Sequence, residues 1–281
     1  MILAADSGST KCDWVLIDHG KEVGRTSTPG FNPNFCDRQF ILKQIEENRL
    51  LNEIKNKVNR LYFFGAGCSG VNNCSRMTED LHSFFSNADV AVENDLMAAV
   101  IATCGHEPGI VCIIGTGSNV CEYDGKRILP NNFGLGYILA DEGAGSYLGK
   151  KLVTNFLYGK LPDDLHEAFE KQYALTKTIV IKNVYQQPGA NTWLAGLVAF
   201  LSAHHDHKWV SDLVSQSFRE FLALYLSDNF RGKNLLVHFV GGVAYQWQDE
   251  LKAVAKDLEL QVGKILRQPA DGLSAYFSKS N

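Results

Sequence analysis

The chain has no long apolar run, no block of basic residues and no cysteine pair with metal-ligand spacing. A membrane-spanning helix needs about 20 consecutive apolar residues, and no run approaches that length. Binding to a nucleic-acid backbone usually needs clustered Lys and Arg, whereas the formal net charge is −4 over 281 residues. The seven cysteines are odd in number and scattered, which is typical of reduced thiols. We therefore expect a cytoplasmic protein without a signal peptide, and neither a membrane nor a nucleic acid as partner.

Two short turns rich in glycine and hydroxyl residues are the most informative feature that is present. The first covers residues 6–11 (DSGSTK) and lies between two apolar runs; the second covers 115–119 (GTGSN) and follows the apolar run 110–114. Backbone N–H groups and hydroxyls of such turns can bind phosphate oxygens, and the acid at position 6 can hold a hydrated magnesium ion. A plain hairpin turn explains each motif separately. Their related flanks, with Cys12 aligned to Cys121, indicate instead a duplicated lobe that binds a nucleotide.

Two further motifs stand at the ends of predicted strands, and each has a structural and a functional interpretation. Asn94 and Asp95 close the strand 90–93 and open a helix, so they are either a helix cap or the place of a general base. Gly241 and Gly242 follow a buried strand. They either make a compact turn or let a ligand approach the backbone at a helix start.

The loop 134–145 carries the adjacent acids Asp141 and Glu142 between glycines. Neighbouring like charges repel each other and glycine costs ordering entropy, so this pattern is unusual for a purely structural loop. Carboxylates can accept hydrogen bonds from the hydroxyls of a polyol. The pattern therefore favours a functional loop.

The glycine-rich segment 65–70 (GAGCSG) allows a different hypothesis, a dinucleotide-binding loop. It follows a predicted strand, and Glu93 stands about 20 residues further on, as such a fingerprint requires. We expect the loop to continue through Val71 and Asn72 before its helix starts, which would keep a pyrophosphate away from the helix end. Dinucleotide binding also leaves the two hydroxyl-glycine turns without a role, so we rank it second.

The pattern of apolar residues predicts alternating strands and helices on both sides of a break at 105–109. Strands are expected at 2–6, 12–18, 22–26, 61–64, 90–93, 110–114, 119–123, 127–129 and 235–240, and helices at 39–58, 73–85, 96–103, 210–225, 245–257 and 273–278. Such an order implies mixed sheets with helices on their faces.

With these motifs in hand, the chain resembles the superfamily of hexokinase-type sugar kinases, actin and the ATPase lobe of heat-shock chaperones. Within it, the pattern is most similar to the N-acetylglucosamine kinase family, which is grouped with the activator ATPases of benzoyl-CoA reductase and hydroxyacyl-CoA dehydratase. The resemblance covers nearly the whole chain and rests on the ordered motifs 6–11, 94–95, 115–119, 141–143 and 240–242.

The resemblance implies an α/β, two-lobed actin-like (ribonuclease H-like) ATPase fold with a duplicated mixed-sheet lobe and a central cleft. The N-terminal lobe would cover 1–105, with the C-terminal helix 267–281 as a candidate addition, and the C-terminal lobe would cover 106–266.

The resemblance also implies an ATP-dependent kinase that phosphorylates N-acetylglucosamine, or a related amino sugar or hexose, at the 6-hydroxyl. Asp95 would be the catalytic base and Asp6 would hold Mg²⁺ through water. The ATP phosphates would be bound by Gly8, Ser9, Thr10, Lys11, Thr116 and Gly117, the adenosine by Gly241 and Gly242, and the sugar by Asn34, Ser69, Asn94 and Asp141.

Three alternatives come from other classes of protein. Activator ATPases carry an iron–sulfur cluster through a cysteine just before the second turn, where this chain has Ile113 and Ile114, so this role is disfavoured. A sugar-sensing ATPase that transfers no phosphate and an NAD-dependent oxidoreductase that uses the 65–70 loop are the others. A homodimer is left open.

Overall fold

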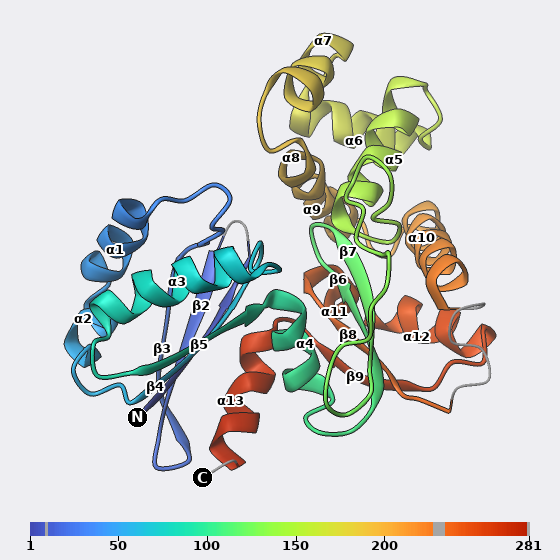
Figure 1. Ribbon diagram of the computed structural model, residues 1–281. Helices are drawn as coiled ribbons and strands as arrows, with labels where there is room; N and C mark the ends of the chain where they lie inside the picture. Colours follow the sequence, from blue (N-terminus) through green and yellow to red (C-terminus); the bar gives the residue numbers. More distant parts are fainter. Residues whose placement is uncertain (9–10, 227–233, 280–281) are drawn as a thin grey trace. The chain divides into compact units, whose positions relative to one another are not determined.

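The computed structural model describes residues 1–8, 11–226 and 234–279, and the chain divides into two compact α/β units (Figure 1). Unit 1 comprises Met1–Glu107 together with Gln268–Asn281, and unit 2 comprises Pro108–Arg267. In chain order, unit 1 contains β1 (Ile2–Ser7), β2 (Lys11–Asp18), β3 (Lys21–Pro29), α1 (Arg38–Glu47), α2 (Arg49–Ile54), β4 (Arg60–Gly65), α3 (Val71–Phe84), β5 (Asp89–Asn94), α4 (Asp95–Thr103) and α13 (Pro269–Lys279). Unit 2 contains β6 (Gly109–Ile114), β7 (Ser118–Tyr123), α5 (Gly145–Leu157), α6 (Asp163–Tyr173), α7 (Lys177–Ile181), the π-helical turn η1 (Lys182–Gln186), α8 (Ala190–Gly196), α9 (Val198–Ala203), α10 (Lys208–Leu226), β8 (Val237–Val240), α11 (Gly242–Gln246), α12 (Gln248–Asp257) and β9 (Val262–Leu266).

A five-stranded mixed sheet forms the centre of unit 1, in the order β3-β2-β1-β4-β5. β1 runs antiparallel to β2 and parallel to β4, and β4 is parallel to β5. In the register of these strands Ser7 pairs with Gly65, and Gly65 pairs with Asn94. The carboxyl ends of three parallel strands therefore meet at one edge of the sheet, which is where ligand sites of such sheets usually lie.

Helices cover both faces of the unit 1 sheet at β1 and β2, where successive side chains alternate between the two faces. Leu3 and Trp14 pack against residues of α1, α2 and α3, whereas Ala4 and Val15 pack against α4 and α13. Figure 1 shows the two groups of helices on either side of the strands. β1 is thus held from both sides, which fixes the position of its last residues.

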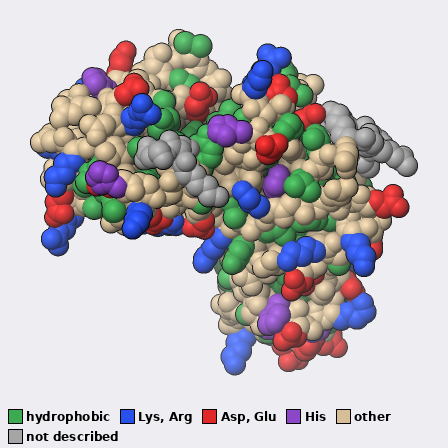
Figure 2. Space-filling model, turned by 90° about the horizontal axis from the view of Figure 1, so that it is seen from below, with side chains coloured by type: hydrophobic (Ala, Val, Ile, Leu, Met, Phe, Trp, Pro, Cys, Tyr) green, Lys and Arg blue, Asp and Glu red, His purple; other side chains and the backbone are tan. Residues whose placement is uncertain are grey.

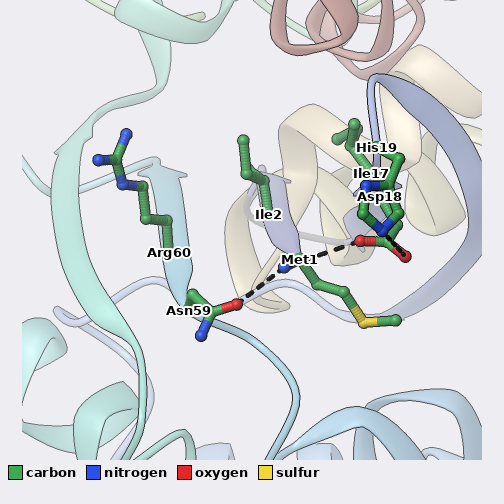
Figure 3. A pocket seen from close by; sticks show the side chains of 7 residues that line it. All are labelled: Met1, Ile2, Ile17, Asp18, His19, Asn59 and Arg60. Carbon is green, nitrogen blue, oxygen red and sulfur yellow. Dashed lines mark hydrogen bonds and ion pairs between the residues drawn. The ribbon is translucent and has the colours of Figure 1, made fainter. Parts of the chain in front are cut away.

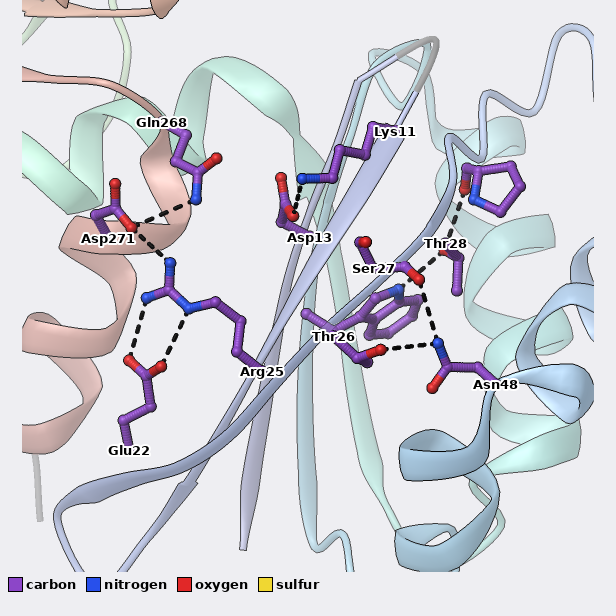
Figure 4. A network of polar contacts seen from close by, with 12 residues as sticks. Lys11, Asp13, Glu22, Arg25, Thr26, Ser27, Thr28, Asn48, Gln268 and Asp271 are labelled. Carbon is purple, nitrogen blue, oxygen red and sulfur yellow. Dashed lines mark hydrogen bonds and ion pairs between the residues drawn. The ribbon is translucent and has the colours of Figure 1, made fainter.

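The helix α13 returns late in the chain to complete unit 1. Its Leu273 and Phe277 are buried against the sheet. Arg25 of β3 adds polar contacts, donating to Glu22 through Nε (3.0 Å) and to Asp271 of α13 through Nη1 (2.5 Å) (Figure 4). These charged side chains are 33–41% exposed, so apolar burial stabilises the packing of α13 more than the ion pairs do.

A four-stranded mixed sheet, in the order β7-β6-β8-β9, forms the centre of unit 2. β6 is antiparallel to β7 and parallel to β8, and β8 is parallel to β9. β6 thus has the same kinds of neighbour as β1, with β7, β8 and β9 in the places of β2, β4 and β5. This shared topology confirms the duplicated mixed-sheet lobe that the sequence predicted.

The helix α10 supplies much of the core of unit 2. The helix predicted over 210–225 is confirmed, and its apolar residues, spaced three and four apart, form a stripe on one face that packs against α5, α12, β6 and β8. The buried members of the stripe are Val210, Val214, Phe218, Phe221, Leu222 and Tyr225.

Two predicted helices are interrupted in the structure. The helix predicted over 39–58 is divided into α1 and α2 at Asn48, whose backbone is extended. Asn48 Oδ1 accepts from the Leu51 N–H at 3.2 Å, and Asn48 Nδ2 donates to Thr26 Oγ1 of β3 at 2.9 Å. A side chain that satisfies backbone groups in this way starts a new helix instead of continuing the old one. The helix predicted over 245–257 is likewise divided into α11 and α12.

The structure also departs from the predicted strands in two places. β9 was not predicted. The strand predicted over 127–129 is reduced to an isolated bridge between Ile128 and Tyr123. Asp124 Oδ1 accepts from two backbone N–H groups that follow it, so the chain closes a tight turn there before it can form a ladder.

No helix within the described ranges combines the length and the apolar character that crossing a bilayer requires. On the face shown in Figure 2, Lys and Arg side chains are scattered among Asp and Glu side chains. This face therefore does not present the continuous basic strip with which proteins follow a phosphate backbone.

Candidate functional site

Two acids near the ends of different strands share one electrostatic environment at the carboxyl edge of the unit 1 sheet. Asp6 is the last residue but one of β1, and Asp95 opens α4 directly after β5; both are half-buried. Burial, followed by the charges of Asp95 and Asp13, raises the pKa of Asp6 to about 7. Burial also raises the pKa of Asp95, against the opposing effect of the Leu96 N–H. The structure thus brings together the predicted magnesium ligand and the predicted base.

Asn94 and Asp95 cap the helix α4, as their structural interpretation predicted. The Leu96 N–H donates to Asn94 Oδ1 at 2.8 Å and to Asp95 Oδ1 at 3.1 Å. These bonds hold the Asp95 carboxylate at a helix N-terminus, where negative charge is favoured. A carboxylate has about four acceptor positions, so the cap leaves Asp95 able to accept a further proton or hydrogen bond.

The residues around Asp6 fit a magnesium ion bound through water. Lys11 lowers the pKa of Asp6, but its Nζ already lies 2.7 Å from Asp13 Oδ1, so negative charge remains in excess (Figure 4). Among the described residues, no three His, Cys, Asp or Glu side chains are grouped as a metal cage. Mg²⁺ suits such a donor set, because it is usually bound by one or two carboxylates with waters and substrate phosphates.

The first turn is described only at its ends. The Gly8 N–H donates to the Lys11 carbonyl at 3.0 Å, which brings the end of β1 to the start of β2. Ser9 and Thr10, which were predicted to bind phosphate, lie outside the described residues.

Three of the predicted sugar-binding residues lie at the same edge of unit 1. Asn94 Nδ2 donates to Ser69 Oγ at 2.7 Å. Asn73 on α3 donates from Nδ2 to the Gly67 carbonyl at 2.9 Å and to Asn34 Oδ1 at 3.0 Å. Asn34 and Ser69 are exposed, so their remaining hydrogen-bonding groups are accessible to a ligand.

The glycines of the 65–70 loop accommodate the protein's own side chains. A Cβ at Gly65 would lie 2.6 Å from the Phe63 ring, and one at Gly67, where φ is +82°, would lie 2.3 Å from Asn32 Oδ1. The helix α3 begins directly after the loop, two residues earlier than predicted, so the loop length does not argue against a dinucleotide. Dinucleotide binding is disfavoured for another reason: side chains of the protein already occupy the space next to Gly65 and Gly67 that a pyrophosphate would need.

The second turn, in unit 2, is held by the loop that carries Asp141. The Ser118 N–H donates to Asp141 Oδ1 at 3.0 Å, and Ser118 Oγ donates to the Glu142 carbonyl at 3.0 Å. A Cβ at Gly117 would lie 2.7 Å from Asp141 Oδ2, so glycine is needed there to admit the carboxylate. The Ser146 N–H, at the start of α5, donates to the turn at 2.9 Å.

Asp141 is both buried and strained. Its φ of +68° lies in the left-handed region, which costs a non-glycine residue about 1–2 kcal/mol. Burial raises the pKa of its carboxyl, whereas the Ser118 N–H lowers it. Strain of this kind is often retained at functional sites. The structure places Asp141 against the glycine turn of its own unit, while the other predicted sugar ligands belong to unit 1.

Glu142, next to Asp141, fastens the same loop to α10. Glu142 Oε2 accepts from the Tyr225 hydroxyl at 2.8 Å. Burial and this bond to Glu142 raise the pKa of Tyr225. Each of the two adjacent acids thus has its own donor, which explains how their repulsion is tolerated.

The two glycines after β8 differ in their surroundings. Gly241 has a φ of +131°, and a Cβ there would lie 2.2 Å from the Ile114 carbonyl oxygen. Gly242 has no atom within 4 Å of a built Cβ. Gly241 therefore serves the close approach of β8's end to the second turn, and Gly242 is the one with space for a ligand.

A separate hollow of about 400 Å³ lies at the opposite edge of the unit 1 sheet, where β1 and β4 begin (Figure 3). Its acid, Asp18, lies 3.9 Å from the Met1 amino group and 3.9 Å from His19 Nε2. None of the residues predicted to bind ligands lines it. The lining residues are Met1, Ile2, Ile17, Asp18, His19, Asn59 and Arg60.

Sequence reasoning missed Asn73, although it contacts both the 65–70 loop and Asn34. Asn73 belongs to an amide pair, with Asn72, at the start of α3. A pair of amides directly after a candidate ligand loop is the signal that could have pointed to it.

A solved structure of a similar protein decides the family. The chain matches the "Putative N-acetylglucosamine Kinase" of Porphyromonas gingivalis at 38% sequence identity, with a TM-score of 0.93 and coverage of 99% of each chain. The chain belongs to the N-acetylglucosamine kinase family. As a member of this family, it is an ATP-dependent carbohydrate kinase.

More distant structures share the fold of this kinase. The "Putative N-acetylglucosamine Kinase" of Chromobacterium violaceum is 20% identical, with a TM-score of 0.67 over 98% of each chain. A ROK family glucokinase from Streptomyces griseus, solved with glucose and AMPPNP, is 14% identical, with a TM-score of 0.54 over 99% of this chain and 97% of that one. The predicted actin-like ATPase fold is thereby confirmed. No protein-family model and no curated protein sequence matches the chain.

Proposed function

We propose that this kinase transfers the γ-phosphoryl group of ATP to the 6-hydroxyl of N-acetylglucosamine or a closely related amino sugar. One observation carries the proposal: Asp95, a half-buried carboxylate with a raised pKa, opens α4 at the sheet edge that also presents Asn34, Ser69 and Asn94. An acceptor flanked by hydroxyl and amide groups suits a polyol. The 38% identity to the Porphyromonas gingivalis protein supports an acetamido sugar.

Asp95 is the group that removes the proton of the attacking hydroxyl. Phosphoryl transfer asks little covalent chemistry of a protein, and positioning and charge stabilisation supply most of the rate. A base works best when its pKa lies near the operating pH, and burial moves Asp95 in that direction. The capping bonds from Leu96 keep the carboxylate in place while a hydroxyl approaches.

The phosphate groups of ATP are assigned to the two turns. In unit 1, Gly8 offers backbone at the end of β1, and Asp6 would hold Mg²⁺ through water; the ion would neutralise phosphate charge. In unit 2, Thr116 and Gly117 would contact phosphate, and Gly242 would contact the adenosine, since it has open space beside it. We also propose that the enzyme works in the cytoplasm, where ATP is available.

The test is an ADP-release assay with Mg-ATP and a panel of N-acetylglucosamine, N-acetylmannosamine, N-acetylgalactosamine and glucose, together with a sugar-free control. We expect the highest kcat/KM with N-acetylglucosamine, and a product whose phosphorus couples to the C6 protons in NMR spectra.

Two results would contradict the proposal in different ways. ADP release that no sugar increases would indicate a sensing ATPase. A clear preference for glucose would retain a hexokinase-type reaction and remove the amino-sugar specificity.

A further inference from the structure

Two hydrogen-bond chains at the edge of unit 1 begin at backbone groups whose polarity cannot change. The first begins at the Gly67 carbonyl, which can only accept. Asn73 must therefore present its NH₂ group to Gly67, and the observed Nδ2–O distance is 2.9 Å. The same Nδ2 lies 3.0 Å from Asn34. An NH₂ group has two hydrogens, so Asn73 donates one to the Gly67 carbonyl and the other to Asn34.

The orientation of Asn34 follows from this. Because Asn73 donates to it, the Asn34 atom on that side is the acceptor, Oδ1. The Asn34 NH₂ group is then the part that remains for other partners, and it meets no acceptor within the described part of the chain. Asn34 is exposed, and its Nδ2 lies over Gly67, 2.8 Å from the place of a built Cβ. Asn34 is thereby set as a donor toward a ligand.

The second chain begins at the Leu96 N–H, which can only donate. Asn94 presents Oδ1 to it at 2.8 Å, so its NH₂ group is directed toward Ser69 Oγ, 2.7 Å away. Ser69 accepts this bond, and its one hydroxyl hydrogen must point elsewhere. No acceptor for that hydrogen is found among residues 1–8, 11–226 and 234–279, and Ser69 is exposed. Ser69 is thereby set as a second donor.

The helix α3 holds the loop of Asn34 at a second place as well. Arg76 Nη2 donates to the Pro33 carbonyl at 2.7 Å and to the Cys36 carbonyl at 2.6 Å. Asn73 and Arg76 are three residues apart and thus lie on the same face of the helix. Arg76 fixes the main chain on both sides of Asn34, and Asn73 fixes its side chain.

We propose that Asn73 is a positioning residue that orients Asn34, so that the sugar site offers two donors, Asn34 Nδ2 and the Ser69 hydroxyl, beside one acceptor, the Asp95 carboxylate. The inference rests on the proposed function and adds a direction to each hydrogen bond. The hydroxyl that is phosphorylated donates to Asp95, and the sugar oxygens at Asn34 and Ser69 accept. At these two positions, a sugar substituent that can only accept a hydrogen bond should still bind, whereas a substituent that neither accepts nor donates should bind poorly.

Analogues of the sugar test this on the unmodified enzyme. In N-acetylglucosamine the 3- or the 4-hydroxyl is replaced by fluorine, which accepts weakly and cannot donate, or by hydrogen, which does neither. We expect kcat/KM for the fluoro compound to exceed that for the deoxy compound by about fivefold or more at one or both positions, the worth of a retained hydrogen bond. Equal values for the fluoro and deoxy compounds at both positions would overturn the inference.

The variant Asn73→Asp tests the role of Asn73 itself. The introduced carboxylate cannot donate, so the Asn34 amide turns to give it the NH₂ group and presents Oδ1 to the sugar. We expect the KM for the sugar to rise about tenfold or more, an unchanged KM for ATP, and loss of the preference for fluorine over hydrogen. The matched control is Asn72→Asp, which makes the same charge change at an exposed neighbour on α3.

Kinetics of the two variants separate the inference from the proposed function. If Asn73→Asp behaves like Asn72→Asp while N-acetylglucosamine is phosphorylated normally, the inference alone fails. If the unmodified enzyme phosphorylates no sugar, the proposed function fails and the inference fails with it.

Discussion

Burial and then the charge of Asp95 raise the pKa of Asp6, although Asp6 lies near the end of β1 and Asp95 directly follows β5, and the two strands are separated in the sheet by β4. This coupling follows from the register that aligns Ser7, Gly65 and Asn94 at one edge. With Asp6 proposed as the magnesium ligand and Asp95 as the base, predictions follow for each residue.

Replacing Asp95 by Asn removes the proposed base and keeps its size. We expect kcat with the best sugar to fall by about a hundredfold to ten-thousandfold, the usual contribution of a general base. Binding of a non-hydrolysable ATP analogue, measured by calorimetry, should stay near normal, because Asn can also cap α4. The control is Asp89→Asn at the other, exposed end of β5. Near-normal turnover of the Asp95→Asn variant would show that Asp95 is not the base.

The pH dependence of kcat/KM should show the raised pKa of Asp95. The base acts only when ionised, so activity is present above its pKa and lost as the pH falls through it. Because burial raises that pKa above the ordinary value of 3.8, the loss begins at a higher pH than for an exposed aspartate. Activity should then fall about tenfold per pH unit. ADP measured by chromatography from neutral to acidic pH checks this, and a loss that begins only at the pH expected for an exposed aspartate would contradict it.

Asp6→Asn should stabilise the free protein while impairing its use of Mg-ATP. The folded-state pKa of Asp6, about 7, lies above its ordinary value of 3.8, so the ionised form disfavours the folded state. Stability contributed by the protonated form is present below pH 4 and is lost as the pH rises through about 7. At pH 8 without metal we expect a gain of about 1–2 kcal/mol, seen as a Tm increase by calorimetry, and at pH 4 almost none. An equal gain at both pH values would indicate another cause.

The neighbouring glycines after β8 should respond in opposite ways to alanine. Gly241→Ala places a Cβ against the Ile114 carbonyl in a positive-φ backbone, so we expect a loss of about 2–4 kcal/mol in the free energy of unfolding. Gly242→Ala meets open space at the start of α11 and should be neutral or stabilise by up to about 1 kcal/mol. Urea unfolding of the two variants measures the difference. If Gly242 lies beside the adenosine, its variant should still raise the KM for ATP.

Much of the fold could be predicted from the sequence, because β1, β2 and β6 carry clear apolar runs next to turn residues. β9 could not, since its five residues include Gly263 and Lys264 and are at most half-buried, so the apolar signal is weak. The break at Asn48 depends on a bond to Thr26 of a distant strand, which no local pattern contains.

The candidate site shows the same division. Spacing and residue type were enough to select Asp6, Asp95 and Gly117 as candidates. The orientation of Asn34 could not, because it is fixed by Asn73, 39 positions away in the chain, and by the backbone of Gly67. Which end of the Asn34 amide faces a ligand therefore depends on contacts that form only in the folded protein.

The return of α13 to unit 1 has a consequence for how the protein is made. One side of the first sheet, including Ala4 and Phe64, is covered by Ala270, Leu273 and Phe277, which are translated after all of unit 2. During synthesis the apolar residues of that side stay without this cover, exposed or bound by a chaperone, while about 160 further residues emerge from the ribosome. A nonsense mutation near residue 268 would therefore spare every motif residue of the site and still leave unit 1 unable to mature.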